Sequence, residues 1–345
     1  MKSFGLSAMA ATAMAAQENG KCYAVAFSSG DESSAYQAGV IQGLIQHYGA
    51  AETAWTSTSG VSGGAVNAAI LASFGVGDEQ AAADRMVKFW EDAASSKLYK
   101  DWIGGVTEGL LLKGGLYNDA PLKSFLSDEL ADIGAMQREI DIGITDVLTG
   151  SYHDFTKADL SANLQDAMYA SFSYAGFFPP AQSMGSDWFD GSVIWDVDIF
   201  SAVNACLETH SQADTVVDVI LTSDKTLKQV DASNYHSISM LWRFLEISRY
   251  YNNMDGLLRA QFAYPNITFR SVISPSSSLP SSIYPLVSIK YNSRTNYLRS
   301  EPQLGSSRYC CLHGNLGCYE RSPDRERCRR YPTLLRPQEE ETRRY

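Results

Sequence analysis

The sequence predicts one three-layer α/β/α domain with a largely parallel central sheet, and two observations support this. Short apolar runs typical of buried strands alternate with segments of helical apolar spacing through most of the chain. A strand, a Gly/Ser-rich turn and a helix follow one another twice before residue 75. Of the 345 residues, 45% are hydrophobic and 19% charged, so the chain can bury a sizeable core and is not a low-complexity sequence.

The first strand–turn–helix unit starts at residue 22. Residues 22–27 (CYAVAF) are a continuous apolar run, which favours a buried strand. Residues 28–34 (SSGDESS) are small and polar, as in a turn. Helical spacing follows at Gln37, Val40, Ile41, Leu44 and Ile45. We therefore expect a helix directly after this turn.

The second unit contains a G-x-S-x-G match. Residues 54–58 are short and β-prone, residues 60–64 read GVSGG, and residues 65–74 are apolar on all sides, which indicates a buried helix. In this motif the serine sits on a tight strand-to-helix turn that exposes its hydroxyl, and glycines such as Gly60 and Gly64 permit the turn. The sequence therefore predicts Ser62 as a nucleophile, with the helix dipole directed at developing negative charge.

The remaining body continues the alternation. Helices are predicted at residues 79–98, 161–172, 200–207 and 236–262, and strands at residues 140–148, 152–155, 188–190, 215–221 and 267–273. Residues 102–116 mix five glycines with apolar side chains. That composition fits either a lid that touches lipid or a packed loop.

The N-terminal segment has the features of a secretory signal. Residues 1–16 hold one basic residue, a short Ala/Met-rich apolar run and an A-x-A site, and the run is too short to span a bilayer. We expect residues 1–16 to be a signal peptide and the protein to be secreted or lumenal. The main domain is predicted over residues 20–285.

The C-terminal segment differs in charge and cysteine content. Residues 286–345 lose the periodic apolar pattern and are expected to form a basic Arg/Cys-rich, disordered tail. The last 56 residues carry a net charge of +5. Because the whole chain carries −11, the residues before Lys290 carry −16. The spacing of cysteines in this tail matches no structural zinc site. The acidic body argues against nucleic acid and against anionic membranes as partners.

A serine hydroxyl needs a base, and the sequence offers two kinds. None of the five histidines lies in a motif that marks a catalytic base, although His210 or His236 could complete a Ser-His-Asp triad. The α/β-hydrolase fold, however, places several strands ahead of its nucleophile, whereas one clear and one weak strand precede Ser62. Asp190, followed by Gly191 and Ser192, offers a carboxylate at the end of a predicted strand instead.

Four motifs in this order resemble the patatin-like phospholipase family of lipid acyl hydrolases. They are the loop around Gly30, AYQAGV at residues 35–40, GVSGG at residues 60–64 with NAA at 67–69, and DGS at residues 190–192. AGFFPP at residues 175–180 is similar to the segment ahead of the family's aspartate. The resemblance covers about residues 22 to 280.

The resemblance implies a patatin-like fold and a Ser–Asp dyad without histidine. Asp190 would accept the proton of Ser62 as its oxygen attacks a lipid ester, and water would then release the fatty acid from an acyl-enzyme. Backbone N–H groups of Ser29, Gly30 and Asp31 would form the oxyanion hole. No metal or organic cofactor is needed. The partners implied are a lipid or phospholipid substrate and transient contact with a lipid surface.

The oxyanion loop departs from the family pattern. The family usually has three glycines, a variable residue, Arg or Lys, and glycine, whereas residues 29–34 read SGDESS. Serine keeps the N–H but lacks the access of glycine to positive φ. Asp31 and Glu32 would oppose a developing negative charge. Three functions therefore stay open: a lipid acyl hydrolase, a catalytically weak lipid-binding relative, and a histidine-dependent esterase.

Overall fold

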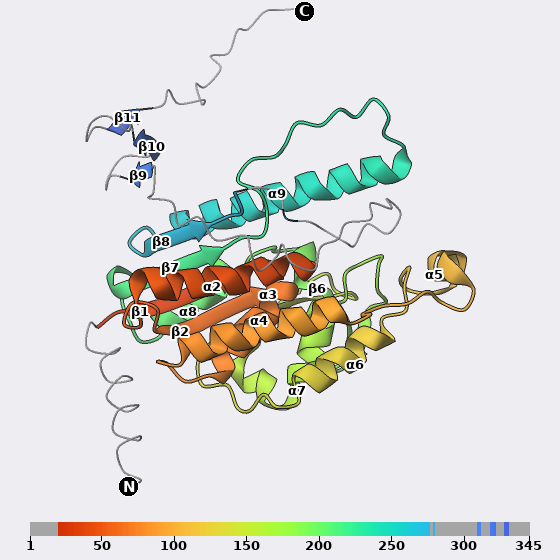
Figure 1. The fold of residues 1–345 in the computed structure, drawn as a ribbon, viewed down its shortest axis with the longest axis horizontal. Coiled ribbons are helices and arrows are strands. Elements are labelled where there is room, and N and C mark those ends of the chain that lie inside the picture. The colour runs from red at the N-terminus through yellow and green to blue at the C-terminus, as the bar shows by residue number, and fades with distance from the viewer. Residues whose placement is uncertain (1–19, 277–278, 280–308, 312–317, 322–327, 331–345) are drawn as a thin grey trace, which may run out of the picture. The chain divides into compact units, whose positions relative to one another are not determined.

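The computed structural model describes residues 20–276, 279, 309–311, 318–321 and 328–330 (Figure 1). The chain divides into two units, residues 1–302 and residues 303–345, which are described separately. The predicted signal peptide and the predicted domain end at residue 285 lie outside the described residues.

An eight-stranded sheet forms the centre of the first unit, in the order β5-β6-β3-β2-β1-β7-β8 with β4 also paired to β3. The strands are β1 (Cys22–Phe27), β2 (Trp55–Val61), β3 (Glu139–Asp146), β4 (Tyr152–Thr156), β5 (Ala181–Ser183), β6 (Ser186–Asp190), β7 (Thr215–Ile220) and β8 (Thr268–Ile273). β3, β2, β1, β7 and β8 run parallel, and β4, β5 and β6 are antiparallel to their neighbours. This confirms the largely parallel α/β sheet.

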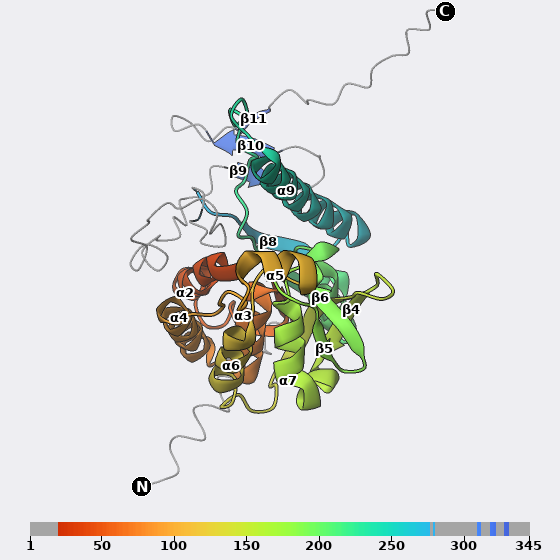
Figure 2. The same cartoon turned by 90° about the vertical axis from the view of Figure 1, so that its right-hand side faces the viewer.

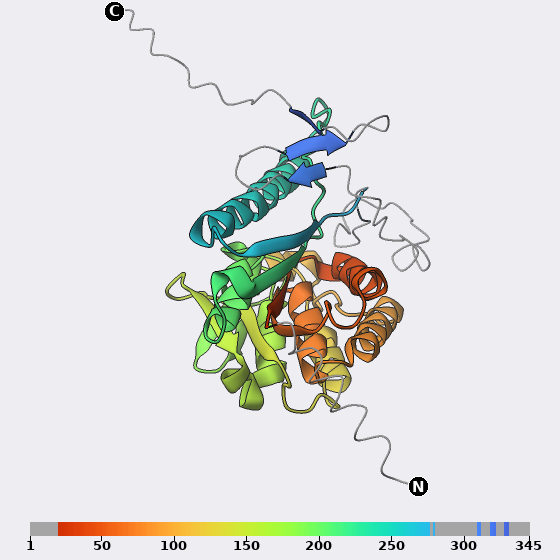
Figure 3. The same ribbon diagram turned by 90° about the vertical axis from the view of Figure 1, so that its left-hand side faces the viewer.

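Helices cover both faces of this sheet. They are η1 (Asp31–Ser34), α2 (Ala35–Tyr48), α3 (Gly63–Ser73), α4 (Glu79–Ser95), α5 (Gly105–Leu112), α6 (Ala120–Glu129), α7 (Lys157–Ser171), η2 (Gly191–Val193), α8 (Ile199–Leu207), η3 (Gln212–Asp214) and α9 (Ser237–Ala263). Figures 2 and 3 show α2 and α4 on one side of the sheet and α8 and α9 on the other, with α9 beside β8. No helix in the described part of the chain is both long and apolar enough to cross a bilayer.

The central strand β1 contributes to two separate cores. Tyr23, Val25 and Phe27 pack in the larger core with α2, α3 and α4, while Cys22, Ala24 and Ala26 pack in the smaller core with α8. All six side chains are buried. Because successive side chains of a strand point to opposite faces, a strand covered on both sides needs the continuous apolar run that its sequence shows.

A disulfide joins Cys22 at the start of β1 to Cys206 near the end of α8, with 5.7 Å between the Cα atoms. It lies at the amino-terminal edge of the parallel strands. The cross-link therefore fixes α8 to the central strand at the edge opposite Ser62.

The predicted helices and strands of the body occur near their expected positions, and some further elements were not predicted. These are α6, the short strand β5 and the short helices η1, η2 and η3. Residues 102–116 contain α5, which leads away from the sheet in Figure 1. Ile103 just before it and Leu110, Leu111 and Leu112 at its end are exposed.

The described part of the second unit is a three-stranded antiparallel sheet in the order β11-β10-β9. The strands are β9 (Tyr309–Cys311), β10 (Cys318–Arg321) and β11 (Cys328–Arg330). The sequence predicted no strand here. The rest of the predicted tail lies outside the described residues.

Candidate active site

Ser62 lies at the turn between β2 and α3. Its backbone has φ 55° and ψ −128°, a conformation that non-glycine residues rarely adopt, and only 1% of the residue is exposed. Its N–H donates to Ser171 Oγ at 2.8 Å, and that hydroxyl donates to Gly143 O of β3 at 3.1 Å. The chain around Ser62 is thus the tight strand-to-helix turn that the G-x-S-x-G motif requires.

The glycines of this motif are explained by backbone contacts. A Cβ on Gly60 would collide with Gly64 O, and one on Gly64 would collide with Ser28 O. Both obstacles are main-chain atoms that cannot rotate away. Any larger residue at either position would displace the turn that holds Ser62.

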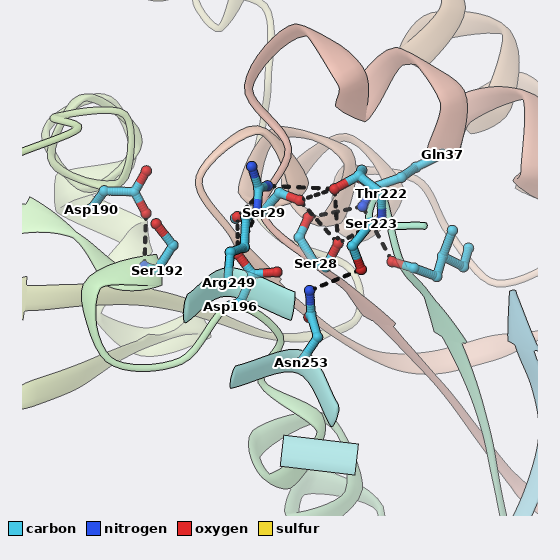
Figure 4. Close-up of polar contacts among 11 residues, drawn as sticks. Ser28, Ser29, Gln37, Asp190, Ser192, Asp196, Thr222, Ser223, Arg249 and Asn253 are labelled. Atoms are coloured by element: carbon cyan, nitrogen blue, oxygen red, sulfur yellow. Dashed lines mark hydrogen bonds and ion pairs between the residues drawn. The ribbon is translucent and has the colours of Figure 1, made fainter. Parts of the chain in front are cut away.

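Asp190 ends β6, next to β3, and is 1% exposed. Its Oδ1 accepts a hydrogen bond from Ser192 N at 2.8 Å (Figure 4). A Cβ on Gly191 would lie 2.5 Å from Gly143 O. The Asp-Gly-Ser sequence therefore combines a carboxylate, a residue that fits against β3 and a backbone donor.

Ser62 and Asp190 come from separate strands and lie close together. Within the described chain, Ser62 Oγ and Asp190 Oδ2 are both buried and neither makes a hydrogen bond. Burial raises the pKa of Asp190 to about 6, while the Ser62 hydroxyl, the groups of Ser192 and the charge of Arg249 act to lower it. The Ser62 hydroxyl therefore lies near enough to the Asp190 carboxyl to lower its pKa.

The two candidate histidines lie elsewhere. His210 contacts Thr209 at 2.8 Å, just ahead of β7, and therefore at the amino-terminal edge of the parallel strands. Ser62 follows the carboxyl end of β2, at the opposite edge. His236 is exposed at the start of α9. This placement gives no support to a histidine-dependent triad.

The loop after β1 brings Ser29, Gly30 and Asp31 to this edge of the sheet. The N–H of Ser29 donates to Asp196 O at 2.7 Å, and its hydroxyl donates to Asp196 Oδ1. In the described structure no hydrogen bond involves the N–H of Gly30 or Asp31. The predicted donor at Ser29 is thus already occupied, whereas the two that follow it are available.

Asp31 is the residue of this loop with an unfavourable backbone conformation. Its φ of 48° lies in the left-handed region, where the absent glycine would fit without strain. Its pKa is raised to about 7, chiefly by burial; Arg249 lowers this pKa, while Glu32, Asp190 and Asp196 also raise it.

Two buried amides hold the loop in place. Gln37 Nε2 donates to Ser28 O at 2.8 Å and to Ile220 O at 3.2 Å. Asn67 Nδ2 donates to Ser34 O at 3.0 Å and to Gln37 Oε1 at 2.8 Å. Both residues lie in segments of the family resemblance, but the sequence alone assigned them no role.

Sequence reasoning missed Arg249 of α9. Its Nη2 donates to Ser29 Oγ at 2.6 Å and to Thr222 Oγ1 at 3.4 Å, and its Nε donates to Asp196 Oδ1 at 3.0 Å (Figure 4). One turn later, Asn253 Nδ2 donates to Ser223 Oγ at 3.1 Å. A helix was predicted here, yet nothing in its sequence distinguishes Arg249 from its other basic residues.

A cavity of about 210 Å³ lies beside the loop. Its lining includes Asp31, Tyr174, Leu227, Lys228, Trp242 and Arg249. Ser62 and Asp190 are not among the residues that line it. In the described part of the chain, no group of three or more His, Cys, Asp or Glu side chains is placed to hold a metal ion.

The sequence matches the patatin-like phospholipase family over residues 25–203, just over half of the chain. Among solved structures, VipD from Legionella pneumophila is similar at 11% identity over 81% of this chain and 67% of that chain, with a TM-score of 0.36. No curated protein matches the sequence. The family match contains the loop, Ser62 and Asp190 and ends before α9. On the extent of this match, the chain belongs to the patatin-like phospholipase family.

Proposed function

We propose that this protein hydrolyses acyl esters of lipids with Ser62 as nucleophile and Asp190 as general base. The supporting observation is a pair of buried oxygens, Ser62 Oγ and Asp190 Oδ2, that lack hydrogen-bond partners among the described residues. Buried polar atoms normally have partners, so an unpaired one calls for an explanation, and a catalytic role is one such explanation. Catalytic hydrogen bonds are often long before substrate binds. Membership of a lipid acyl hydrolase family provides the reaction class.

In the proposed reaction, ionised Asp190 accepts the proton of Ser62 Oγ as that oxygen bonds to the ester carbonyl carbon. The N–H groups of Gly30 and Asp31 stabilise the resulting oxyanion. Collapse of the intermediate breaks the ester bond, and Asp190 returns the proton to the departing alcohol. Asp190 then takes a proton from water as the water oxygen bonds to the acyl carbon, and it passes that proton to Ser62 Oγ as the acyl–enzyme bond breaks and the fatty acid leaves. Ser29, whose N–H is occupied, anchors the loop in this scheme.

A fluorophosphonate probe tests the nucleophile. The wild-type protein should be labelled at Ser62, and Ser62→Ala should lose both labelling and ester hydrolysis. Ser73→Ala, at the other end of α3, is the matched control and should behave as wild type. Equal labelling of Ser62→Ala and wild type would rule out the assignment.

A catalytically weak lipid-binding protein is the second candidate function, and the position and backbone conformation of Asp31 favour it. A carboxylate in the left-handed region beside the proposed oxyanion site opposes turnover. The two candidates differ in one measurement. Lipid binding without turnover, followed by turnover when glycine replaces Asp31 and lysine replaces Glu32, would support the weaker function.

We also propose that α5 contacts the lipid surface. Ile103 is fully exposed, and the exposed fractions of Leu110, Leu111 and Leu112 lie between 69% and 77%. Exposed apolar clusters of this kind mark interaction sites. The charge of −16 on the chain before Lys290 disfavours an anionic surface, so a zwitterionic one is the better partner.

Finally, we propose that the protein acts in the secretory pathway or outside the cell. The signal-like pattern of residues 1–16 and the Cys22–Cys206 disulfide both support an oxidising compartment.

A further inference from the structure

Arg249 connects three segments that converge on the proposed oxyanion site. Its guanidinium donates to Ser29 on the loop after β1, to Asp196 in the segment after η2, and to Thr222 just after β7. Ser29 also donates to Asp196 through both its N–H and its hydroxyl. Ser29, Asp196 and Arg249 therefore form a closed arrangement, in which each side chain contacts the other two.

The same guanidinium is placed among acidic groups. Asp196, Asp31 and Asp190 all act on Arg249 electrostatically. Arg249 in turn lowers the pKa of both Asp31 and Asp190. The loop has no basic residue of its own, so α9 supplies from a distant part of the sequence a positive charge that the loop lacks.

The Arg249 side chain is more exposed than that of an arginine in a buried structural ion pair. Asp196 is 1% exposed, but 36% of the Arg249 side chain is exposed, and it lines the cavity beside the loop together with Asp31. Arg270, which pairs with buried Asp218, is 11% exposed. Arg249 thus binds the loop through its guanidinium and also lines the cavity beside it.

Building on the proposed function, we propose that Arg249 is a positioning residue for the reaction. By holding Ser29 against Asp196, it fixes the N–H groups of Gly30 and Asp31 where the oxyanion forms. Its charge also offsets the carboxylate of Asp31 at that point. Arg249 lies in α9, outside the residues that match the family.

Substitution of Arg249 in the full chain is the first test, with p-nitrophenyl butyrate as the substrate. Arg249→Gln should lower kcat by about 10- to 100-fold, somewhat less than loss of a direct oxyanion donor, with KM changed less than about twofold. Arg249→Lys, which keeps the charge, should recover much of the loss. Arg259→Gln is the matched control on the same helix, because Arg259 is 70% exposed and pairs only with nearby Asp255 among the described residues.

A second substitution separates the charge from packing. Asn replaces the Asp31 carboxylate with a neutral group and is well tolerated in the left-handed region. If Arg249 offsets the charge of Asp31, Asp31→Asn should restore part of the activity lost in Arg249→Gln. The double-mutant cycle should then show coupling between the two positions.

The pH profile provides a readout that a purely structural role would leave unchanged. Arg249 of α9 is the charged group that lowers the pKa of Asp190, while Asp190 itself raises the pKa of Asp31 of η1, Tyr152 of β4 and Tyr174 after α7. Loss of the Arg249 charge should move the acid limb of kcat/KM to higher pH.

Hydrogen exchange of the amides in residues 27–36 tests the arrangement independently of activity. Exchange should be faster in Arg249→Gln than in wild type and near wild type in Arg249→Lys. Wild-type kcat and exchange in Arg249→Gln would overturn the proposal. The proposal would also be overturned if Arg249→Gln lost activity while the acid limb of its kcat/KM profile did not move and Asp31→Asn restored no activity. A wild-type protein without esterase activity would refute the proposed function instead, while the exchange rates would still decide whether Arg249 holds the loop.

Discussion

Asp190 combines burial with the proposed role of general base, so activity should depend on pH. Its carboxyl has a pKa raised to about 6 by burial, and it can accept a proton only when ionised. Below pH 6 the carboxyl holds its proton, so kcat/KM should fall about tenfold per pH unit there and level off above about pH 7. A profile measured with a neutral soluble ester checks this. An acid limb near pH 4, the range of an ordinary aspartate, would contradict the raised pKa.

The sequence could identify those site residues whose identity is required by their neighbours along the chain. Gly60 and Gly64 must lack a side chain because the backbone passes within contact distance, and Ser62 must lie between them. That requirement leaves a short motif in the sequence. Arg249 meets its partners Ser29 and Asp196 only after the chain has folded, so no spacing along the sequence marks it.

At the scale of the element, α5 should determine attachment to lipid. Burying one leucine side chain is worth about 1.5–3 kcal/mol, so Leu111→Ser should weaken partition onto phosphatidylcholine vesicles about tenfold or more. Vesicle co-sedimentation of the full chain measures this. Leu148→Ser is the matched control, because Leu148 is 73% exposed in the turn after β3. Equal binding of the Leu111 and Leu148 variants would exclude α5 as the contact.

Element prediction succeeded where burial imposes a pattern. β1 is covered on both faces and reads as an unbroken apolar run, and the fully buried α3 is apolar on all sides. β5 has only three residues, too few for a period to show. Residues 102–116 left two alternatives open, because apolar side chains and glycines occur both in packed loops and in helices that face a partner. The exposure of the apolar side chains in the structure favours a partner.

At the scale of the molecule, the disulfide should contribute much of the stability. Cys22 and Cys206 are 184 residues apart, and cross-links typically contribute about 2–4 kcal/mol by restricting the unfolded chain. Reduction should therefore lower Tm by about 5–10 °C. The variant in which Ala replaces both cysteines should show a similar low Tm without any further response to reductant. Alkylation of both thiols in unreduced protein would show that the bond is absent.

The order in which the site is assembled follows from the position of α9 in the sequence. Ser62 and Asp190 are synthesised early, whereas Arg249 follows β7 and emerges from the ribosome later than any other residue of the proposed site. A partly synthesised chain would therefore hold the proposed nucleophile and base before the guanidinium that fixes the loop. Full hydrolytic activity would arrive only once α9 has docked, which would keep attack on the membranes used in synthesis low until then.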